Sequence, residues 1–209
     1  MLAEILRRAR ELKLLTASCE ASIDATGLEN RYVSRYFLDR RGRPGRTSCH
    51  RWWTKLTVVV DHRSHLVLAV VVGRGPGNDA PHFLPAVGQA VARVRIRCLL
   101  GDAAYDAEEH HRRCREDWGI GETIIPVNTR AHPQYPSRGP YRRELRRKFP
   151  RKKYGQRWQV ESVFSLAKRR LTSHLRARDD ATRETESLLL VITYNLMLLT
   201  GTRKAFYKA

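Results

Sequence analysis

The segment from residue 154 to residue 168 reads Tyr154-Gly-Gln-Arg157-Trp-Gln-Val-Glu161-Ser-Val-Phe-Ser-Leu-Ala-Lys168. At about 100° per residue, four polar side chains of this segment fall within roughly 60° of one another on a helix. They are Tyr154, Arg157, Glu161 and Lys168. The adjoining face is apolar and suited to a core; it carries Val160, Val163, Phe164, Ala167 and Leu171. On periodicity alone, a solvated polar face beside a buried one is the simpler interpretation. The polar stripe is also able to hold a metal ion beside a phosphate backbone.

Charge is the second marked feature of the chain. The 209 residues include 40 Lys and Arg against 21 Asp and Glu, which gives a net charge of +19. Such an excess predicts a polyanionic partner, and nucleic acid is favoured over an anionic membrane surface. The hydrophobic content of 42% is enough for a core, and the length suits one large domain with or without a small appendage.

Cysteine usage and hydropathy indicate the compartment. The four cysteines form no Cys-x-x-Cys pair and no signal peptide precedes them, so they are expected to be reduced thiols of a cytosolic protein. The longest apolar stretch, residues 187–199, is too short to span a bilayer and predicts a buried helix. The sequence therefore predicts no membrane partner.

Strand and helix patterns alternate along the chain, which predicts an α/β fold with a mixed sheet flanked by helices. Strands are expected over residues 19–25, 55–61, 65–73, 95–101 and 123–127. Helices are expected over residues 2–14, 80–92 and 181–200, in addition to the helix that begins at Tyr154. The predicted organisation is a short basic helix in residues 1–18 and one large domain in residues 19–209, with a basic loop at 129–153.

Two aspartates stand where a metal site is expected. Asp24 and Asp102 each follow an apolar segment predicted to be a strand. Carboxylates at strand ends, joined by one from a packing helix, can converge at one edge of a sheet. Oxygen ligands in that number suit Mg²⁺ or Mn²⁺ rather than zinc. Taken alone, however, an Asp after a strand is more often a turn former or a helix cap.

Together these blocks resemble a family. The spacing Tyr-x2-Arg-x3-Glu-x6-Lys resembles the signature of a large group of insertion-sequence transposases. The segment Ser22-Ile-Asp24-Ala-Thr26 resembles their first catalytic block, and Gly101-Asp102-Ala-Ala-Tyr105-Asp106 resembles the second. The likeness runs in order over about residues 20–200. It implies a ribonuclease H-like fold, in which Asp24, Asp102 and Glu161 are the catalytic residues and the ligands of two Mg²⁺ or Mn²⁺ ions.

The function implied by this resemblance is DNA transposition. The chain would cut a DNA strand at the end of an insertion sequence and transfer the resulting 3′-hydroxyl into target DNA. Arg157 and Lys168 would clamp phosphates, Tyr154 would orient the DNA end, and Trp158 would contact DNA. The implied partners are double-stranded DNA and a second copy of the chain, in the prokaryotic cytoplasm and at the nucleoid. Two alternatives stay open, a structure-selective nuclease on the same fold and a non-catalytic basic DNA-binding remnant.

Residues 129–153 are expected to form an electrostatic track for DNA. They contain ten Arg and Lys against one Glu, together with several prolines, which favours phosphate binding over a core. The residues singled out for this role are Arg146, Arg147, Lys152 and Lys153. A solvated linker is the alternative.

The chain departs from the family before its first block. Many relatives carry a sizeable N-terminal helical domain, and the stretch before Ser22 is too short for a helix-turn-helix. The chain is therefore expected to lack its DNA-recognition domain, as a fragment, one half of a split reading frame or a decayed copy.

Several other polar and aromatic residues receive structural interpretations. Asp61 is expected to start a hairpin turn, and Asp79 and Asp106 are expected to cap helices. The neighbours His110 and His111 point about 100° apart on a helix and are expected on a solvated face. Of the pair Trp52 and Trp53, packing of one ring in the core is favoured over stacking on a base.

Overall fold

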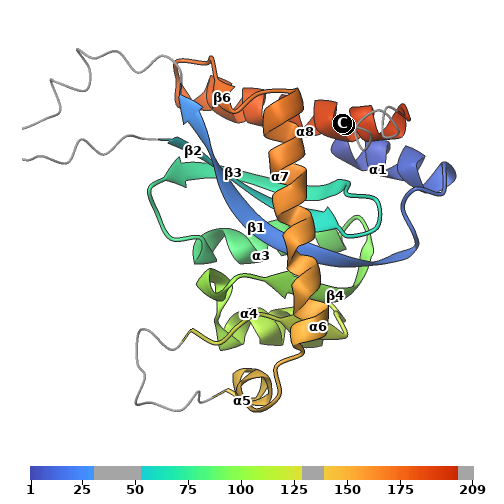
Figure 1. The fold of residues 1–209 in the computed structure, drawn as a ribbon, viewed down its shortest axis with the longest axis vertical. Helices are drawn as coiled ribbons and strands as arrows, with labels where there is room; N and C mark the ends of the chain where they lie inside the picture. The colour runs from blue at the N-terminus through green and yellow to red at the C-terminus, as the bar shows by residue number, and fades with distance from the viewer. Residues whose placement is uncertain (31–52, 129–138, 202–209) are drawn as a thin grey trace, which may run out of the picture.

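The computed structural model describes residues 1–30, 53–128 and 139–201 (Figure 1). A mixed sheet of six strands forms the centre, with the order β3-β2-β1-β4-β5 and with β6 paired to the far end of β1. Strand β1 is antiparallel to β2, which is antiparallel to β3, whereas β4 and β6 run parallel to β1 and β5 runs parallel to β4. The strands are β1 (Ser18–Asn30), β2 (Trp53–Asp61), β3 (Val67–Gly75), β4 (Arg95–Gly101), β5 (Glu122–Ile124) and β6 (His174–Leu175).

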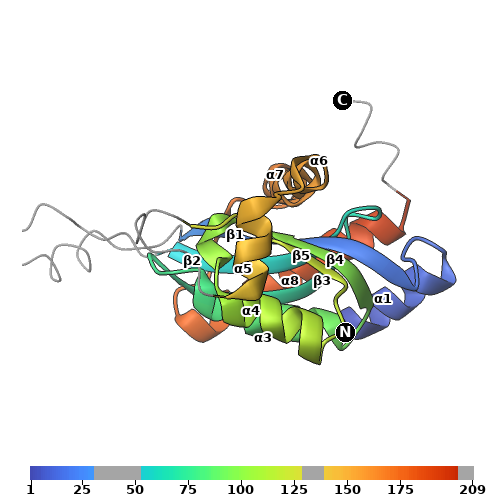
Figure 2. The same cartoon turned by 90° about the horizontal axis from the view of Figure 1, so that it is seen from below.

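Helices cover both faces of this sheet. Figure 2 shows α6 and α7 on one side of the strands and α3 and α4 on the other. The α-helices are α1 (Leu2–Glu11), α3 (Ala80–Val91), α4 (Glu108–Arg112), α5 (Pro140–Arg147), α6 (Arg151–Tyr154), α7 (Trp158–Arg170) and α8 (Asp180–Leu199). Three single-turn elements join them, η1 (Ala103–Tyr105), η2 (Arg113–Asp117) and η3 (Gly155–Arg157). The predicted α/β class, a mixed sheet flanked by helices, is confirmed.

The core lies between the sheet and these helices. Strand β2 is buried along nearly its whole length because both of its faces are covered. Phe83 of α3 and Val160 of α7 are fully buried on opposite sides. The three described cysteines, Cys19, Cys98 and Cys114, are buried free thiols, as expected, and burial raises the pKa of each to about 12.

Strand β1 is longer than the sequence predicted. The Thr26-Gly27 dipeptide suggested a strand end, but β1 continues to Asn30 and pairs with β2 as far as Leu28. Gly27 has a packing role here, because a Cβ at this position would lie 2.8 Å from the Trp53 ring. Asp24 therefore lies within a strand and not at its end. The Trp53 ring packs against Gly27 of β1 and Gly75 of β3 but is only partly buried and lies outside the core, whereas Trp52 lies outside the described residues.

The prediction of a basic loop over 129–153 is wrong for its second half. Residues 140–147 form α5 and residues 151–154 form α6. Residues 129–138 lie outside the described part of the chain. The last predicted strand, 123–127, is also shorter than expected and covers Glu122–Ile124.

The closing helix α8 is tied to the first strand in the sheet order. The buried carboxamide of Asn195 accepts a hydrogen bond from the backbone N–H of Val67 (2.9 Å) and donates one to its carbonyl (2.8 Å). Helix α1 also packs against α8. Within the described residues, no helix combines the length and the apolar character that crossing a bilayer requires.

Candidate active site

The predicted signature helix lies across β1, and its polar side chains meet that strand. The segment is continuous in sequence but consists of α6, the single turn η3 and α7. Figure 1 shows α7 crossing the central strands. The guanidinium of Arg157 donates from Nη1 to Asp24 Oδ2 (2.8 Å) and from Nη2 to Glu161 Oε1 (2.5 Å). One cation thus bridges two of the three predicted acids.

Asp24 is the most buried member of this group. Its side chain is 19% exposed, and Oδ1 accepts a hydrogen bond from the backbone N–H of Ala25 (2.8 Å). Burial raises the pKa of the Asp24 carboxyl; the Ala25 N–H and Arg157 oppose the shift, and the negative charges of Asp102 and Glu161 add to it. The three acids are therefore electrostatically coupled at Asp24.

Asp102 reaches the same region from the neighbouring strand. Strand β4 runs parallel to β1 with Gly101 opposite Ile23, so Asp102 and Asp24 follow at matching positions. The Asp102 carboxylate accepts a hydrogen bond from the backbone N–H of Ala103 (2.6 Å) and caps the turn η1. The parallel pairing therefore explains how two acids from distant parts of the chain become neighbours.

The donor set can be compared with what a metal ion needs. Among residues 1–30, 53–128 and 139–201, no three His, Cys, Asp or Glu side chains stand ready to hold an ion. The predicted acids nonetheless offer only carboxylate oxygens, which suit Mg²⁺ or Mn²⁺. A cation already lies between two of them, which shows that the site accommodates positive charge. The residues are thus of the chemical type that a divalent ion would need, and Arg157 lies between two of them.

The other signature residues divide between sheet and solvent. Lys168 donates to the hydroxyl of Thr26 (2.7 Å), so the signature segment is hydrogen-bonded to β1 through Lys168 as well as through Arg157. Trp158 is 53% exposed. Tyr154 is half-buried: its ring meets Phe149 edge-on, with centroids 5.0 Å apart, and burial raises the pKa of its hydroxyl, which the positive charge of Arg157 opposes. The sequence pattern did not predict the contact between Thr26 and Lys168, because only the fold brings these two residues together.

Helix α5 is held in place by acidic residues of a distant part of the chain. Both oxygens of Glu108 accept hydrogen bonds from the first backbone N–H groups of α5, those of Tyr141 and Arg142, at 3.0 Å each. Arg142 in turn donates to the buried carboxylate of Asp106 (2.8 and 2.6 Å). On the same helix Glu144 pairs with Arg115 (3.0 Å).

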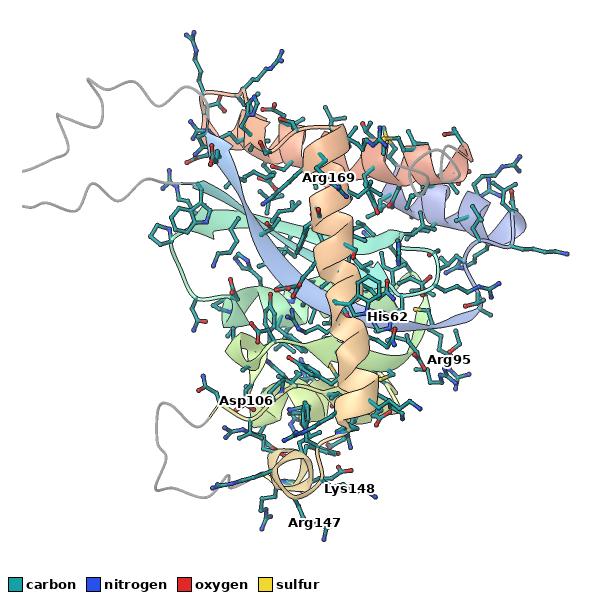
Figure 3. The ribbon with its side chains drawn as sticks, viewed as in Figure 1. His62, Arg95, Asp106, Arg147, Lys148 and Arg169 are labelled. Atoms are coloured by element: carbon teal, nitrogen blue, oxygen red, sulfur yellow. The ribbon has the colours of Figure 1, made fainter. Side chains whose placement is uncertain are left out.

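Most of the predicted DNA-binding cations lie on the outer side of this assembly. Arg146, Arg147 and Lys152 are exposed, whereas Lys153 is paired with Glu122 at 2.5 Å. Figure 3 shows Arg147 and Lys148 at the end of the molecule formed by α5. Further exposed cations on these helices, missed among the many basic residues of the segment, are Arg143, Lys148 and Arg151.

Two predictions for helix α4 are wrong. His110 and His111 are buried, not solvated. The His110 ring stacks on Phe83 at 4.2 Å, and His111 Nδ1 lies 2.7 Å from the Thr123 hydroxyl, so the two rings serve different contacts. Asp106 does not cap α4, which begins after Ala107, because Arg142 and the backbone N–H of Asn128 bind its carboxylate instead. Sequence neighbours alone cannot reveal such distant partners.

The remaining aspartates behave largely as expected. Asp61 accepts hydrogen bonds from the backbone N–H (2.9 Å) and the hydroxyl of Ser64, which confirms its role in the hairpin turn. Asp79 stands at the N-cap position of α3 but makes no capping bond; its carboxylate binds the buried Lys55 (2.6 Å).

Comparison with known proteins identifies the family. The model of the family described as "Transposase DDE domain" matches residues 17–196. Among solved structures, the crystal structure of a pre-cleavage Mos1 transpososome is similar, with 13% sequence identity and a TM-score of 0.34. That alignment covers 99% of this chain and 60% of the Mos1 chain, so the present chain spans about three fifths of its length. No curated protein matches. The structural likeness is distant, and the assignment rests on the domain match, which extends over most of the sequence. The chain belongs to the transposase DDE domain family.

Proposed function

We propose that this transposase domain cuts a DNA strand at the end of an insertion sequence and transfers the exposed 3′-hydroxyl into target DNA. Asp24, Asp102 and Glu161 are the proposed catalytic residues and metal ligands. The supporting observation is their arrangement: a central strand, its parallel neighbour and a crossing helix each supply one acid, and the three are coupled at Asp24.

The chemistry follows from the proposed ligands. Bound divalent ions, two in this proposal, supply charge that activates a water or a 3′-hydroxyl and neutralises the leaving oxygen at phosphorus. The protein orients its carboxylates for this role. Asp24 and Asp102 each direct one oxygen to the next backbone N–H, which limits the rotation of the carboxylate. Glu161 comes from α7 and is the third proposed ligand.

The DNA contacts belong to the same proposal. Arg157 of η3 and Lys168 of α7 both contact β1 and are proposed to bind phosphates near the scissile bond. Tyr154 is proposed to orient the DNA end, and the exposed Trp158 to contact DNA beside it. The exposed cations of α5 and α6 extend the charged surface toward flanking duplex, in keeping with the net charge of +19. A homodimer assembled on DNA completes the proposed active form.

Conservative substitution of the acids tests the reaction. Asp24→Asn, Asp102→Asn and Glu161→Gln should each abolish Mg²⁺- or Mn²⁺-dependent nicking of DNA that carries the repeats flanking the gene. Binding should persist or tighten, because repulsion between carboxylate and phosphate falls. Glu184→Gln, an exposed change on α8, is the matched control and should cut normally.

The possible outcomes separate the candidate functions. Cleavage that survives any one of the three active-site changes would refute the site assignment. Cleavage without strand joining would point to a structure-selective nuclease instead. DNA binding that needs no metal and leads to no cleavage would point to a DNA-binding remnant.

The cationic surface has its own test. Replacing Arg146, Arg147, Lys152 and Lys153 with Gln should weaken binding to any DNA sequence. It should also flatten the slope of log K against log salt by about 0.9 for each phosphate that the variant no longer neutralises. Arg7→Gln with Arg8→Gln is a suitable control, because these exposed cations of α1 are already paired with acids of the same helix. An unchanged slope would show that the segment is a solvated surface only.

A further inference from the structure

Arg157 binds two of the three proposed metal ligands. Its guanidinium binds one oxygen of Asp24 and one of Glu161, at 2.8 and 2.5 Å, and its side chain is only 21% exposed. Burial by itself lowers the pKa of Arg157, but Asp24, Tyr154 and Glu161 outweigh it and the net shift is upward. The group is therefore a fixed positive charge within the carboxylate cluster.

The contact joins two elements, and this distinguishes it from an ordinary surface ion pair. The Arg157–Glu161 pair lies within one helical stretch, four residues apart, whereas the Arg157–Asp24 pair links η3 to β1 across 133 residues. Asp24 Oδ2, the oxygen that Arg157 binds, is distinct from Oδ1, which the Ala25 N–H holds. Among the described residues, only a side chain therefore binds Oδ2, and that side chain can move away without any change in the backbone.

A divalent ion and the guanidinium compete for this oxygen. Both carry positive charge, and in a partly buried site like charges at contact distance repel strongly. Lys168 stands in a different position, because its ammonium donates to the neutral hydroxyl of Thr26. Of the two signature cations, Arg157 is the one whose hydrogen bonds to Asp24 and Glu161 engage the proposed metal ligands.

We propose that Arg157 is a displaceable internal cation that couples metal binding to DNA binding. This inference rests on the proposed function. Before an ion binds, the guanidinium neutralises Asp24 and Glu161 and keeps them together. A DNA phosphate draws Arg157 away from Asp24 and opens the site for the ion. Because coupling between two ligands is reciprocal, an ion bound at Asp24 in turn releases Arg157 for the phosphate.

Direct metal binding tests this coupling without any measurement of catalysis. Mn²⁺ affinity is measured by electron paramagnetic resonance or calorimetry for the wild type, Arg157→Gln and Lys168→Gln. Without DNA, Arg157→Gln should bind Mn²⁺ about tenfold more tightly, within the range of typical coupling between sites. Lys168→Gln removes the same charge from the same signature segment and should change the affinity by less than about threefold, since the hydrogen bond that it loses is to the neutral Thr26 hydroxyl and not to a proposed metal ligand.

The DNA arm of the experiment completes the cycle. Ca²⁺ affinity is measured with and without a short duplex, because Ca²⁺ also takes carboxylate oxygen ligands. The duplex should raise the affinity of the wild type for Ca²⁺ several-fold more than that of Arg157→Gln. Thermal melting verifies that both variants are folded.

Three results overturn the inference, and they differ in what else they overturn. If Asp24→Asn weakens Mn²⁺ binding but Arg157→Gln binds it no more tightly than the wild type, the coupling is refuted and the metal site stands. If DNA enhances Ca²⁺ binding equally in both proteins, Arg157 is not the coupling residue. If the wild type binds no Mn²⁺, with or without DNA, the proposed function fails together with this inference.

Discussion

Replacing Asp106 with alanine removes a buried acceptor that holds α5 against the rest of the molecule. The Asp106 side chain is fully buried and receives two hydrogen bonds from Arg142, at 2.8 and 2.6 Å. A third comes from the backbone N–H of Asn128 at 2.7 Å. The substitution therefore leaves a guanidinium and a backbone N–H without this acceptor.

The size of the effect follows from the burial of the two partners. Breaking a buried ion pair by removing one member costs about 3–5 kcal/mol. Arg142 is 25% exposed and regains some hydration, so we expect the lower part of this range or slightly less, about 2–3 kcal/mol. The two bonds from Glu108 to the start of α5 remain. The effect therefore falls on the docking of α5 more than on the central sheet, and corresponds to roughly 30- to 160-fold more frequent opening of this helix.

Hydrogen exchange is the assay that resolves this local change. The amides of α5 should exchange faster in Asp106→Ala by about the stated factor, while those of β1 and β2 change much less. Asp117→Ala is the matched control, since Asp117 forms a pair with Arg113 in which both side chains are well exposed, 34% and 46%. Such pairs contribute about 0–1 kcal/mol. Equal exchange in α5 for the two variants would refute the argument that the buried Asp106 contact anchors this helix.

Three further predictions concern other parts of the molecule. Burial lowers the pKa of His111 to about 4, below the unfolded value near 6.5, so the unfolded chain binds more protons between these values. His111 therefore makes stability fall as the pH drops from about 6.5 to 4, by about 3 kcal/mol at the end of that window, and full stability is present above it. Urea unfolding across this range should give a steeper pH dependence for the wild type than for His111→Gln, and parallel curves would contradict the prediction. Asn195→Ala leaves the backbone N–H and carbonyl of Val67 without the carboxamide and should lower the free energy of unfolding, measured in urea, by about 2–4 kcal/mol. The exposed control Thr193→Ala should lower it by less than about 0.5 kcal/mol. Similar urea midpoints for the two variants would disprove the prediction. Trp158→Ala should leave stability within about 0.5 kcal/mol and weaken binding to insertion-sequence ends that carry unpaired bases about tenfold, and an unchanged affinity would remove Trp158 from the interface.

The sequence predicted the architecture well because the strands carry strong local patterns. The runs of Val and Leu in β2 and β3 and the buried strand β4 were recognisable without tertiary information. The end of β1 was not, since Gly27 is a turn signal by type and is overruled by the Trp53 ring that packs onto it. Periodicity cannot predict the end of a strand when that end depends on a residue of another strand.

The candidate site shows the same division between local and distant information. The separate contexts of Asp24, Asp102 and Glu161 could be predicted because each acid lies in a short, distinctive segment. The bridge from Arg157 to Asp24 could not, because the helical pattern fixes which side of the helix the guanidinium occupies and not what it meets. Helix α5 was taken for a loop because its high charge masked its helical periodicity; its anchors, Asp106 and Glu108, lie far earlier in the chain.

The link between Asn195 and Val67 has a consequence for how the chain is made. Among the described strands, β3 pairs on one side only, with β2, and an open strand edge rich in Val can pair with another molecule. The Asn195 carboxamide occupies part of that edge, but it lies 128 residues after Val67. At about 5–20 residues per second of synthesis, Asn195 is added to the chain roughly 6–26 s after Val67, and until then it cannot bind the edge of β3. During that interval the nascent chain is open to intermolecular strand pairing, and a chain that stops short of α8 should accumulate in aggregates.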